Sequence, residues 1–299
     1  MCSDKAPETL EALNQRLLAA RRGDETIKGG RRSLLALEKL LHSPQKVALG
    51  SISDAARIAG VHPSTLTRLA HALGYDGFPA FQRVFRKVLV DSPDYYSRHA
   101  DSLMSDARKL AHTSFVERFV EAEITNLRQW AQGFPRQELE AVAERLIRAR
   151  QIWVQAGRQS RSLADLMVYG LGLLRHKVSD LNASDRGIAW GLGQVRKGDL
   201  LVVIGFAPYT RSTLAAATLA GERGAQVLAL TDQPQGPLAA HAHHTVAVPA
   251  DSLFFSNSQV VAVTAIQLIL SQMAAQMGPQ AMERLKAYED RVNQLTQWL

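Results

Sequence analysis

Five short apolar runs in the second half of the chain restrict its fold more than any other feature. They lie at residues 152–156, 177–181, 200–204, 226–230 and 244–248. Patterns typical of helices separate several of these runs, at residues 162–174, 212–224 and 238–242. Continuously apolar strands of this length are buried on both faces, and intervening helices provide the crossovers that parallel strands need. The pattern predicts an α/β domain with a parallel five-stranded sheet flanked by helices.

An open parallel sheet places its binding loops along one edge. Ligands bind in the crevice outside the carboxyl ends of the strands, because the loops that follow the strands meet there. Three loops of this chain follow predicted strands, directly after Ala156, Ile204 and Leu230. We expect a ligand site among these loops.

The first part of the chain has a pattern that predicts helices alone. Ser53 is a suitable N-cap for a short helix, and Gly60 ends that helix, because glycine accepts the unusual backbone angle of a tight bend. Pro63 is tolerated in the first turn of the next helix, which we expect to begin near His62. Two short helices joined by such a bend form a helix-turn-helix.

The second helix of this pair has one apolar face and one polar face. The apolar positions follow helical spacing and predict a core contact through Leu66, Leu69, Ala70 and Leu73. The opposite face is short, polar and basic, which suits a helix lying in the major groove of DNA. The residues expected to contact DNA are His62, Ser64, Thr65, Thr67 and Arg68. Arg68 and Thr65 are the expected principal contacts.

The excess of positive charge is confined to the same part of the chain. Residues 28–90 contain ten lysines and arginines and three acidic residues, a net charge of +7, which equals the net charge of all 299 residues. The remaining residues are therefore neutral in sum. A basic excess localised on helices is typical of phosphate binding. The alternative is a basic helical domain that packs against an acidic partner and has no DNA role.

Composition and periodicity divide the chain into two domains. We assign residues 26–90 to a helix-turn-helix DNA-binding domain and residues 91–105 to a linker, which is polar, contains a proline and lacks periodicity. Residues 106–299 form the α/β domain, which begins with two long predicted helices at 107–131 and 136–149.

The composition also argues against several classes of protein. The single cysteine, Cys2, provides neither a disulfide framework nor a cysteine-based metal site, which fits a reducing cytoplasm. The N-terminus is acidic and polar where a signal peptide would need an apolar run. The most apolar long segment, residues 260–277, is interrupted by three glutamines. We expect it to form a buried or interface helix and not a membrane span.

Two motifs in this order carry a family resemblance. Residues 59–78, A-G-V-H-P-S-T-L-T-R-L-A-H-A-L-G-Y-D-G-F, contain a turn, a Thr-x-x-Arg helix and a Leu-Gly-aromatic-x-Gly-Phe close. The linker, the two long helices, a strand-loop-serine element and G-A-Q-V-L-A-L-T-D follow. In both respects the chain resembles the bacterial RpiR-type (MurR/RpiR) transcriptional regulators. These join an N-terminal helix-turn-helix to a C-terminal sugar isomerase (SIS) domain.

The resemblance implies a ligand site, although the loops depart from the family's pattern. Related SIS domains carry Gly-x-Gly-x-Ser after the first strand, where this chain has Ala156-Gly157-Arg158-Gln159-Ser160. They carry Ser-x-Ser-Gly-x-Thr after a later strand, where this chain has Gly205-Phe206-Ala207-Pro208-Tyr209-Thr210. Nearby guanidinium groups can replace lost hydroxyls as anion donors, or these arginines are surface residues. The expected ligand-binding residues are Arg158, Ser160, Tyr209, Thr210, Arg211, Asp232, Ser256 and Ser258.

These observations predict a DNA-binding transcriptional regulator that is controlled by a small metabolite, a sugar phosphate or another anionic ligand such as an organic acid. The alternative is an enzyme similar to sugar-phosphate isomerases, which needs a glutamate or histidine base near its substrate. The crevice loops contain neither residue. We therefore expect a protein that is not an enzyme and has no catalytic residue.

We expect no metal and no cofactor, because His241, His243 and His244 lack a carboxylate or thiolate partner nearby in the sequence. The expected partners are a double-stranded DNA operator, the small effector and further copies of the chain, as a homodimer or homotetramer. The expected location is the bacterial cytoplasm, with no membrane role.

Overall fold

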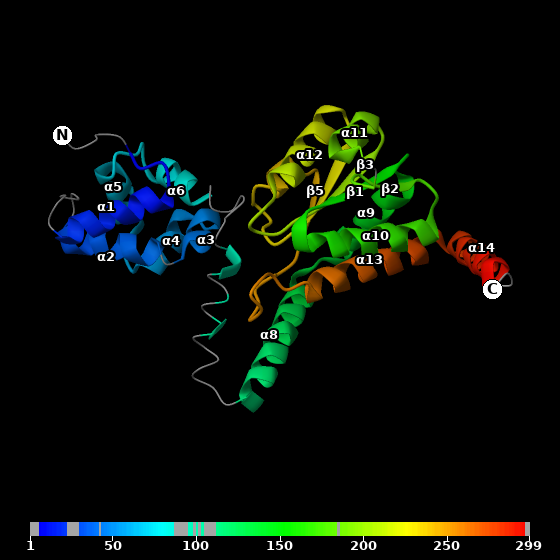
Figure 1. Ribbon diagram of the computed structural model, residues 1–299, viewed down its shortest axis with the longest axis horizontal. Helices are drawn as coiled ribbons and strands as arrows, with labels where there is room; N and C mark the ends of the chain where they lie inside the picture. The colour runs from blue at the N-terminus through cyan, green and yellow to red at the C-terminus, as the bar shows by residue number, and fades with distance from the viewer. Residues whose placement is uncertain are drawn as a thin grey trace. The chain divides into compact units, whose positions relative to one another are not determined.

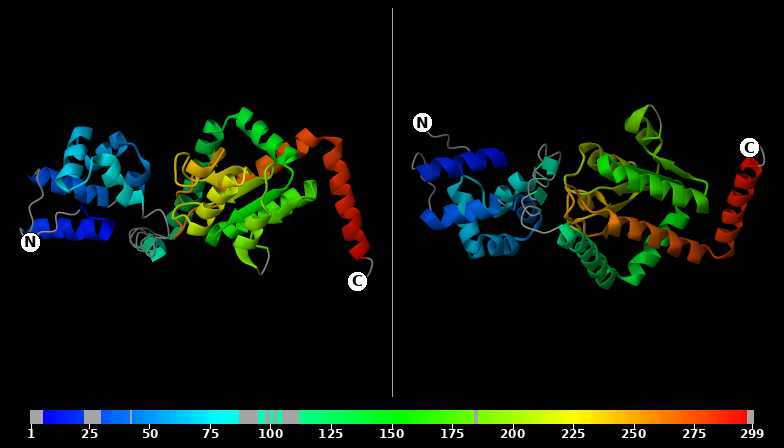
Figure 2. Two further views of the ribbon diagram at one scale, coloured as in Figure 1. Left: turned by 90° about the horizontal axis from the view of Figure 1, so that it is seen from above. Right: turned by 60° about the horizontal axis from the view of Figure 1, so that its bottom comes forward.

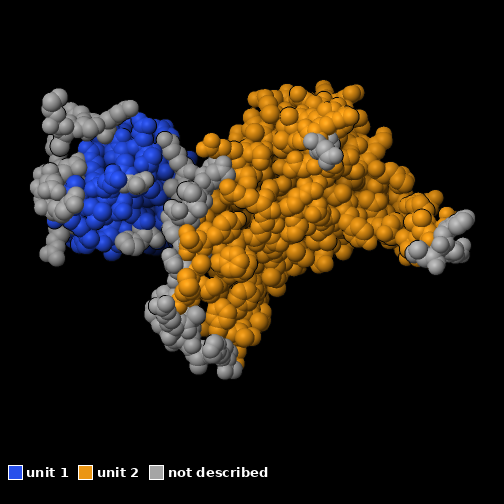
Figure 3. Space-filling model, viewed as in Figure 1, with its two compact units in different colours: residues 1–92 blue, residues 93–299 orange. Residues whose placement is uncertain are grey.

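The computed structural model describes residues 6–22, 30–41, 43–86, 95–97, 100, 103–104, 112–183 and 186–296. The chain forms two compact units, residues 1–92 and residues 93–299, which Figure 3 distinguishes by colour. Unit 1 is helical in its described part, and unit 2 contains a parallel sheet between helices. The predicted fold class, a helical domain followed by an α/β domain, is confirmed.

The described part of unit 1 is a bundle of short helices. These are α1 (Leu10–Arg22), α2 (Gly30–Leu41), α3 (Pro44–Leu49), α4 (Ile52–Ala59), α5 (Pro63–Ala72) and α6 (Phe78–Arg86). The helix α1 is capped by Thr9, whose Oγ1 accepts a hydrogen bond from the Ala12 amide at 3.1 Å. It buries Leu13 and Leu17 in the bundle. The α1 helix is therefore part of the core of unit 1.

The turn between α4 and α5 has the predicted geometry, with one difference at its start. Gly60 has φ +69°, the left-handed conformation that glycine adopts without steric cost. The N-cap of α4 is Ser51, and the prediction of Ser53 was wrong. The Ser51 hydroxyl accepts from the Asp54 amide at 3.2 Å, and the Asp54 carboxylate accepts from the Ser51 amide at 3.0 Å. This reciprocal pair is a capping box and starts the helix two residues earlier.

Unit 2 is built on five parallel strands. They are β1 (Ile152–Ala156), β2 (Val178–Asp180), β3 (Leu200–Ile204), β4 (Gln226–Thr231) and β5 (His244–Ala247), paired in the order β2-β1-β3-β4-β5. The chain passes from β1 outward to β2 and then returns to place β3 on the other side of β1. Strand order therefore reverses between β1 and β3. In open parallel sheets this switch point is where a ligand crevice forms.

Helices cover both faces of the sheet (Figures 1 and 2). On one face lie α9 (Arg136–Arg148), α10 (Arg161–Leu174) and α13 (Val260–Met277), and on the other lie α11 (Gly187–Gln194) and α12 (Arg211–Glu222). Val154, Val202 and Leu228 pack with the first group of helices in one buried core. Two further helices of the described part of the unit are α8 (His112–Gly133) and α14 (Pro279–Thr296).

One helix of the described chain, α13, is long and apolar enough by composition to cross a bilayer. It packs instead as a core helix of unit 2, with Val261, Ile266, Ile269 and Met273 buried in the cluster that covers the sheet. Gln267 and Gln276 of this helix are exposed, and Gln272 is half-buried. This agrees with the predicted buried or interface helix.

The segment predicted as a helix at 238–242 is a single 3-10 turn, Ala239–His241. The carboxyl end of that turn leads directly into β5. Apolar content over five residues does not distinguish one 3-10 turn from the start of an α-helix, because both place residues i and i+3 on the same side.

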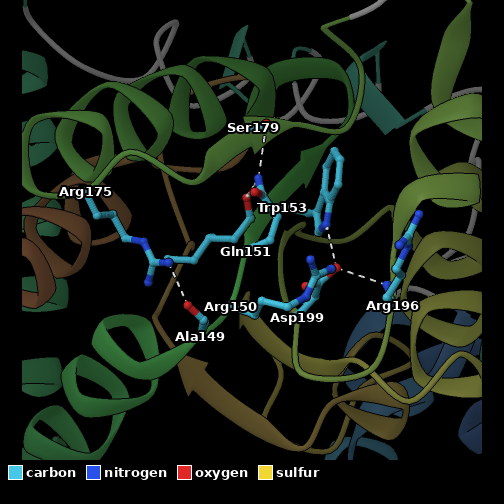
Figure 4. Close-up of polar contacts among 9 residues, drawn as sticks. Ala149, Arg150, Gln151, Trp153, Arg175, Ser179, Arg196 and Asp199 are labelled. Carbon is cyan, nitrogen blue, oxygen red and sulfur yellow. Dashed lines mark hydrogen bonds and ion pairs between the residues drawn. The ribbon is translucent and has the colours of Figure 1, made fainter.

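A buried carboxylate joins the starts of β1 and β3 (Figure 4). The Asp199 side chain is fully buried and forms an ion pair with Arg150 at 2.6 Å. It also accepts from Trp153 Nε1 at 3.1 Å and from the Arg196 backbone amide at 3.0 Å. Buried charges persist in proteins when they are paired and hydrogen-bonded, and Asp199 meets both conditions.

The guanidinium of Arg175 caps the carboxyl end of α9. It donates to the carbonyl oxygen of Ala149 at 2.6 Å and to those of Leu146 and Ile147 (Figure 4 shows the first of these). The last carbonyl groups of a helix have no partner within the helix, so a cation at this end satisfies them.

Candidate functional site

The recognition helix α5 begins at an exposed polar end. His62 is its N-cap, and its Nδ1 accepts from the Ser64 amide at 3.4 Å and lies 2.9 Å from the Ser64 hydroxyl. Pro63 occupies the first turn, as predicted. The first amide groups of a helix point outward and carry partial positive charge, which favours an anion such as a DNA phosphate.

The five residues predicted to contact DNA lie on the outer face of α5. His62, Ser64 and Arg68 are exposed, whereas Thr65 and Thr67 are half-buried. The opposite face buries Leu66, Leu69 and Ala70, as the spacing predicts. The outer face therefore presents three hydroxyl groups, an imidazole and a guanidinium within two turns of one helix.

Contacts with α6 hold the bundle behind this helix. Gln82 is buried, and its amide nitrogen donates to the carbonyl oxygens of Val47 at 2.8 Å and Gly50 at 2.7 Å. Arg86 Nε donates to the Ala48 carbonyl at 3.1 Å. These bonds satisfy the end of α3 just before Ser51 and fix the entry into the helix-turn-helix. Neither residue stood out in the sequence, because their carbonyl partners lie more than 30 residues away.

A narrow cleft lies at the switch point of the sheet in unit 2. The loop after β1 and the loop after β3 form its two sides, and the 254–258 segment lies across it. Gly157 and Thr210 bring the loops together: a β-carbon at position 157 would lie 2.8 Å from Thr210 Oγ1. Glycine at this position therefore permits a close approach that any side chain would prevent.

Four of the residues predicted to bind the ligand line this cleft, namely Arg158, Ser160, Thr210 and Ser256. Arg158 has φ +51°, the only positive φ among the described residues other than glycine. Left-handed backbone at a bulky residue costs of the order of 1 kcal/mol and persists where the surroundings hold it. Here it directs an exposed guanidinium at the rim of the cleft, next to the first turn of α10.

The other four predicted residues do not line the cleft. Tyr209 is buried below it, and its hydroxyl donates to the Asp232 carboxylate at 2.6 Å. Ser258 is buried and donates to Glu123 at 2.6 Å, and Arg211 begins α12 with an exposed side chain. The sequence placed these residues in the right loops, but side-chain direction within a loop depends on packing that periodicity does not report.

The Tyr209 and Asp232 pair supports the loop after β3 from below. Burial raises the pKa of the Asp232 carboxyl, against the lowering effect of its hydrogen bond from Tyr209. Burial and the nearby Asp232 charge raise the pKa of the Tyr209 hydroxyl. Asp232 also accepts from the Ala207 amide at 3.4 Å. The pair positions the 205–210 loop and is not exposed to a ligand in the cleft.

Sequence reasoning missed five polar residues of the cleft: Tyr95, Tyr96, Gln159, Thr213 and Asn257. Gln159 Nε2 donates to the Asn257 carbonyl at 2.7 Å, and its Oε1 accepts from the Ser256 hydroxyl. Asn257 Nδ2 donates to the Ala207 carbonyl at 2.7 Å, which ties the 254–258 segment to the β3 loop. Gln159 and Asn257 are neighbours in the sequence of Ser160, Ser256 and Ser258, so their position in these loops could have identified them as cleft residues. The two tyrosines lie in the predicted linker, where no sequence pattern indicated a contact with the cleft.

Among the described residues that line the cleft there is no carboxylate, histidine or lysine. A proton transfer at a sugar carbon needs such a group within hydrogen-bond reach. Glu123, which does not line the cleft, accepts from Ser258 at 2.6 Å and from Ser252 at 3.4 Å. The cleft as folded provides neutral donors and one guanidinium, which suits the binding of an anion more than its conversion.

The three clustered histidines take part in separate structural contacts. His243 Nδ1 accepts from the Val227 amide at 3.1 Å, His241 lies 3.2 Å from the Thr218 hydroxyl, and His244 contacts Arg145. Burial lowers the pKa of His244, and the Arg145 charge adds to that effect.

Comparisons with known proteins agree with this geometry. Residues 145–277 match the SIS domain family. The chain is 23% identical over 272 residues to the HTH-type transcriptional regulator HexR of Escherichia coli (strain K12). The match covers 86% of this chain and 88% of that protein.

The solved structures that are similar to this chain include two transcriptional regulators. The sugar isomerase domain of an RpiR transcription factor from Sphaerobacter thermophilus is 26% identical, with a TM-score of 0.55, and the match covers 58% of this chain and 97% of that one. The Vibrio vulnificus NanR protein complexed with ManNAc-6P is 18% identical, with a TM-score of 0.59, and the match covers 95% of this chain and 98% of that one.

The similarities extend over both units and in the same order along the chain. The SIS match coincides with the sheet and its switch-point cleft, and the HexR match continues into the helix-turn-helix unit. The chain therefore contains an SIS domain after its helix-turn-helix unit, and it is similar over most of its length to transcriptional regulators of the RpiR type.

Proposed function

We propose that the protein regulates transcription by binding a double-stranded DNA operator through α5 and a small anionic effector, a phosphosugar or an organic acid, in the switch-point cleft. The observation that carries the proposal is the exposed, basic outer face of α5 on a chain whose second unit is an SIS domain. The two functions then belong to separate units joined by a short segment, as in a ligand-controlled switch.

The DNA contact rests on the exposed residues at the start of α5. In helix-turn-helix proteins the N-terminal part of the second helix reaches base edges, and flanking polar groups hold phosphates. Arg68 has the reach and the forked donors for a bidentate contact to guanine or to a phosphate. The hydroxyl groups of Ser64 and Thr65 and the imidazole of His62 lie one turn before it.

The effector contact rests on the donors around the cleft. Ser160, Thr210 and Ser256 supply hydroxyl groups, and Arg158 supplies a charged, forked donor. This set suits a phosphate or carboxylate group. The NanR protein of Vibrio vulnificus was solved with ManNAc-6P, which supports a phosphosugar as the first class to test. An isomerase function is disfavoured, because a general base is absent from the described lining of the cleft.

A second copy of the chain would provide the second recognition helix that a palindromic operator needs. The exposed apolar side chains Tyr169 on α10, Leu268 on α13 and Met282 on α14 lie on neighbouring helices of unit 2. Patches of this kind on a soluble domain are typical of subunit contacts. A homodimer or homotetramer would present two recognition helices to the half-sites of a near-palindromic operator, and an effector that prefers one arrangement would shift their spacing.

The first test is DNA binding by the Arg68→Ala variant. We expect the variant to bind the DNA upstream of the protein's own gene more weakly by about 1 to 3 kcal/mol, because a base or phosphate contact is lost. Fluorescence anisotropy at two or more salt concentrations measures this and separates specific from nonspecific binding. Arg136→Ala, an exposed arginine of unit 2, is the control. Equal affinity of Arg68→Ala and the unchanged protein would count against this docking.

The second test is a thermal-shift screen of phosphosugars and small organic acids, including N-acetylmannosamine 6-phosphate. A compound that binds only the folded protein at 100 times its dissociation constant adds about 2.7 kcal/mol of stability and raises the melting temperature. The Ser160→Ala variant should reduce the shift, because one donor of the cleft is removed. Ser53→Ala, an exposed serine of unit 1, should leave it unchanged. An equal shift in Ser160→Ala would place the ligand elsewhere.

A further inference from the structure

The cleft is nearly full in the structure. The space inside it is about 30 Å³, enough for about two water molecules. Two other clefts of unit 2 each have about 550 Å³, which falls in the range of roughly 300 to 1,000 Å³ that is usual for small-ligand sites. A phosphosugar therefore cannot enter the switch-point cleft unless one of its walls moves.

One wall differs from the others in origin. The loops after β1 and β3 are anchored to central strands, and the 254–258 segment is tied to both loops by Gln159 and Asn257. Tyr95 and Tyr96 come instead from a short helical segment of the predicted linker. Two residues of sequence separate Tyr95 from Ser92, where unit 1 ends. This wall is the one that can leave without breaking the sheet.

Tyr95 is held in the cleft by a defined bond. Its side chain is 3% exposed, and its hydroxyl donates to Asn257 Oδ1 at 2.8 Å. Asn257 uses its nitrogen to donate to the Ala207 carbonyl, so its oxygen faces Tyr95 as an acceptor. The Tyr96 ring packs edge-on against Tyr95 with the ring centroids 5.3 Å apart, and Tyr96 is 41% exposed. The buried Tyr95 side chain, held by the hydrogen bond of its hydroxyl group, therefore occupies space in the cleft that a polar ligand would need.

We propose that Tyr95 occupies part of the effector site, and that the effector displaces it from Asn257. The inference rests on the proposed function, and it assigns the transmission of effector binding to the side chain of Tyr95. Tyr95 competes with the effector for the same acceptor and the same space. Its release changes the predicted linker, and this converts occupancy of the cleft into a change in the segment that follows unit 1 in the sequence. A ligand that prefers the displaced state shifts the population toward it.

The affinity of the full-length protein for N-acetylmannosamine 6-phosphate tests displacement. Tyr95→Phe removes only the hydroxyl and the bond to Asn257, and a net hydrogen bond corresponds to about a five-fold change in an equilibrium constant. We expect Tyr95→Phe to bind the compound about five-fold more tightly in isothermal titration, because less of the protein must be converted to the open state. Tyr75→Phe, which removes a hydrogen-bonded hydroxyl from a buried tyrosine of unit 1, is the matched control and should bind the compound as the unchanged protein does. Unchanged or weaker binding by Tyr95→Phe would overturn the proposal, since a tyrosine that helps to hold the ligand weakens binding when it is altered.

A second measurement needs no ligand and separates this proposal from the proposed function. Hydrogen exchange followed by mass spectrometry reports the peptides that contain residues 205–210 and 256–258. Tyr95→Ala should increase their exchange at least about five-fold, because the cleft loses the group that fills it. Equal exchange in Tyr95→Ala and the unchanged protein would overturn the role of Tyr95, even if no compound binds. If exchange increases and neither N-acetylmannosamine 6-phosphate nor inorganic phosphate binds any variant, the ligand class in the proposed function is wrong and the role of Tyr95 stands.

A third measurement follows the affinity of the protein for its operator DNA. Addition of a compound that binds the cleft should change the operator affinity of the unchanged protein, and the change should be lost in Tyr95→Ala, because the displaced state is already populated. An equal response of both proteins to the compound would show that the signal does not pass through Tyr95.

Discussion

Replacing Phe81 with alanine lowers the free energy of unfolding of unit 1 by about 3 to 5 kcal/mol. Phe81 is fully buried, and its ring packs against Tyr75, Phe78 and Phe85 with centroid distances of 5.4, 6.1 and 5.0 Å. The variant loses the burial of the ring and leaves a cavity, and the neighbouring rings lose edge-to-face contacts. Small domains have total stabilities of about 5 to 15 kcal/mol, so a large share of the stability of this unit is removed.

The consequence for function is selective. Because α5 and α6 pack together, the recognition helix loses its support and operator binding falls with the folded fraction of unit 1. The SIS unit has its own core and should keep its fold. Urea titration followed by NMR signals assigned to each unit measures the two transitions separately. Arg83→Ala, an exposed residue on the same helix, is the control. A variant Phe81→Ala with unchanged unfolding of unit 1 would contradict the assigned core.

Replacing Asp199 with alanine lowers the stability of the SIS unit by about 2 to 3 kcal/mol. The carboxylate is fully buried and accepts from Trp153 and from the Arg196 amide, and it is paired with Arg150. Removing it leaves an indole N–H and a backbone N–H without their acceptor at the start of two central strands. Arg150 is about half exposed and recovers water, which keeps the loss below the full value for breaking a buried ion pair.

Two further variants separate the charge from the hydrogen bonds. Asp199→Asn keeps one acceptor oxygen, and we expect it to recover about half of the loss. Asp165→Ala removes an exposed acid from an i,i+4 ion pair with Arg161 and should change stability by less than about 0.5 kcal/mol. Denaturant titration of the SIS transition measures all three. If Asp199→Ala and Asp165→Ala cost the same, the buried cluster does not stabilise the sheet.

Much of the fold could be predicted because local patterns agree with the tertiary structure. The continuous apolar runs of β3 and β4 became buried parallel strands, since a strand covered on both faces must be apolar on both, whereas the edge strand β2 is half-buried. The bend at Gly60 could be placed because a left-handed backbone angle selects glycine. The start of α4 was misplaced because Ser51 and Ser53 both have the chemistry of an N-cap, and only the reciprocal bonds with Asp54 distinguish them.

The sequence predicts which loops form the ligand cleft, but it does not predict which of their side chains point into it. Arg158, Ser160, Thr210 and Ser256 line it, as expected from their loops. Tyr209 turns inward to Asp232 instead, because that buried carboxylate offers its hydroxyl an acceptor. A loop residue takes whichever direction satisfies its polar group and packing, and both depend on partners from elsewhere in the chain.

The amino-acid sequence by itself determined the two classes of secondary structure, the turn of the helix-turn-helix, the polar face of α5 and the concentration of positive charge on the first unit. Each of these depends on residues a few positions apart. The tertiary structure alone decided that strand order reverses between β1 and β3, that Asp199 joins their starts, and that Tyr95 fills the cleft by bonding to Asn257, 162 residues away. The physical reason is that a cleft is the space left among packed elements, so its walls and its occupant are defined only when distant segments come together.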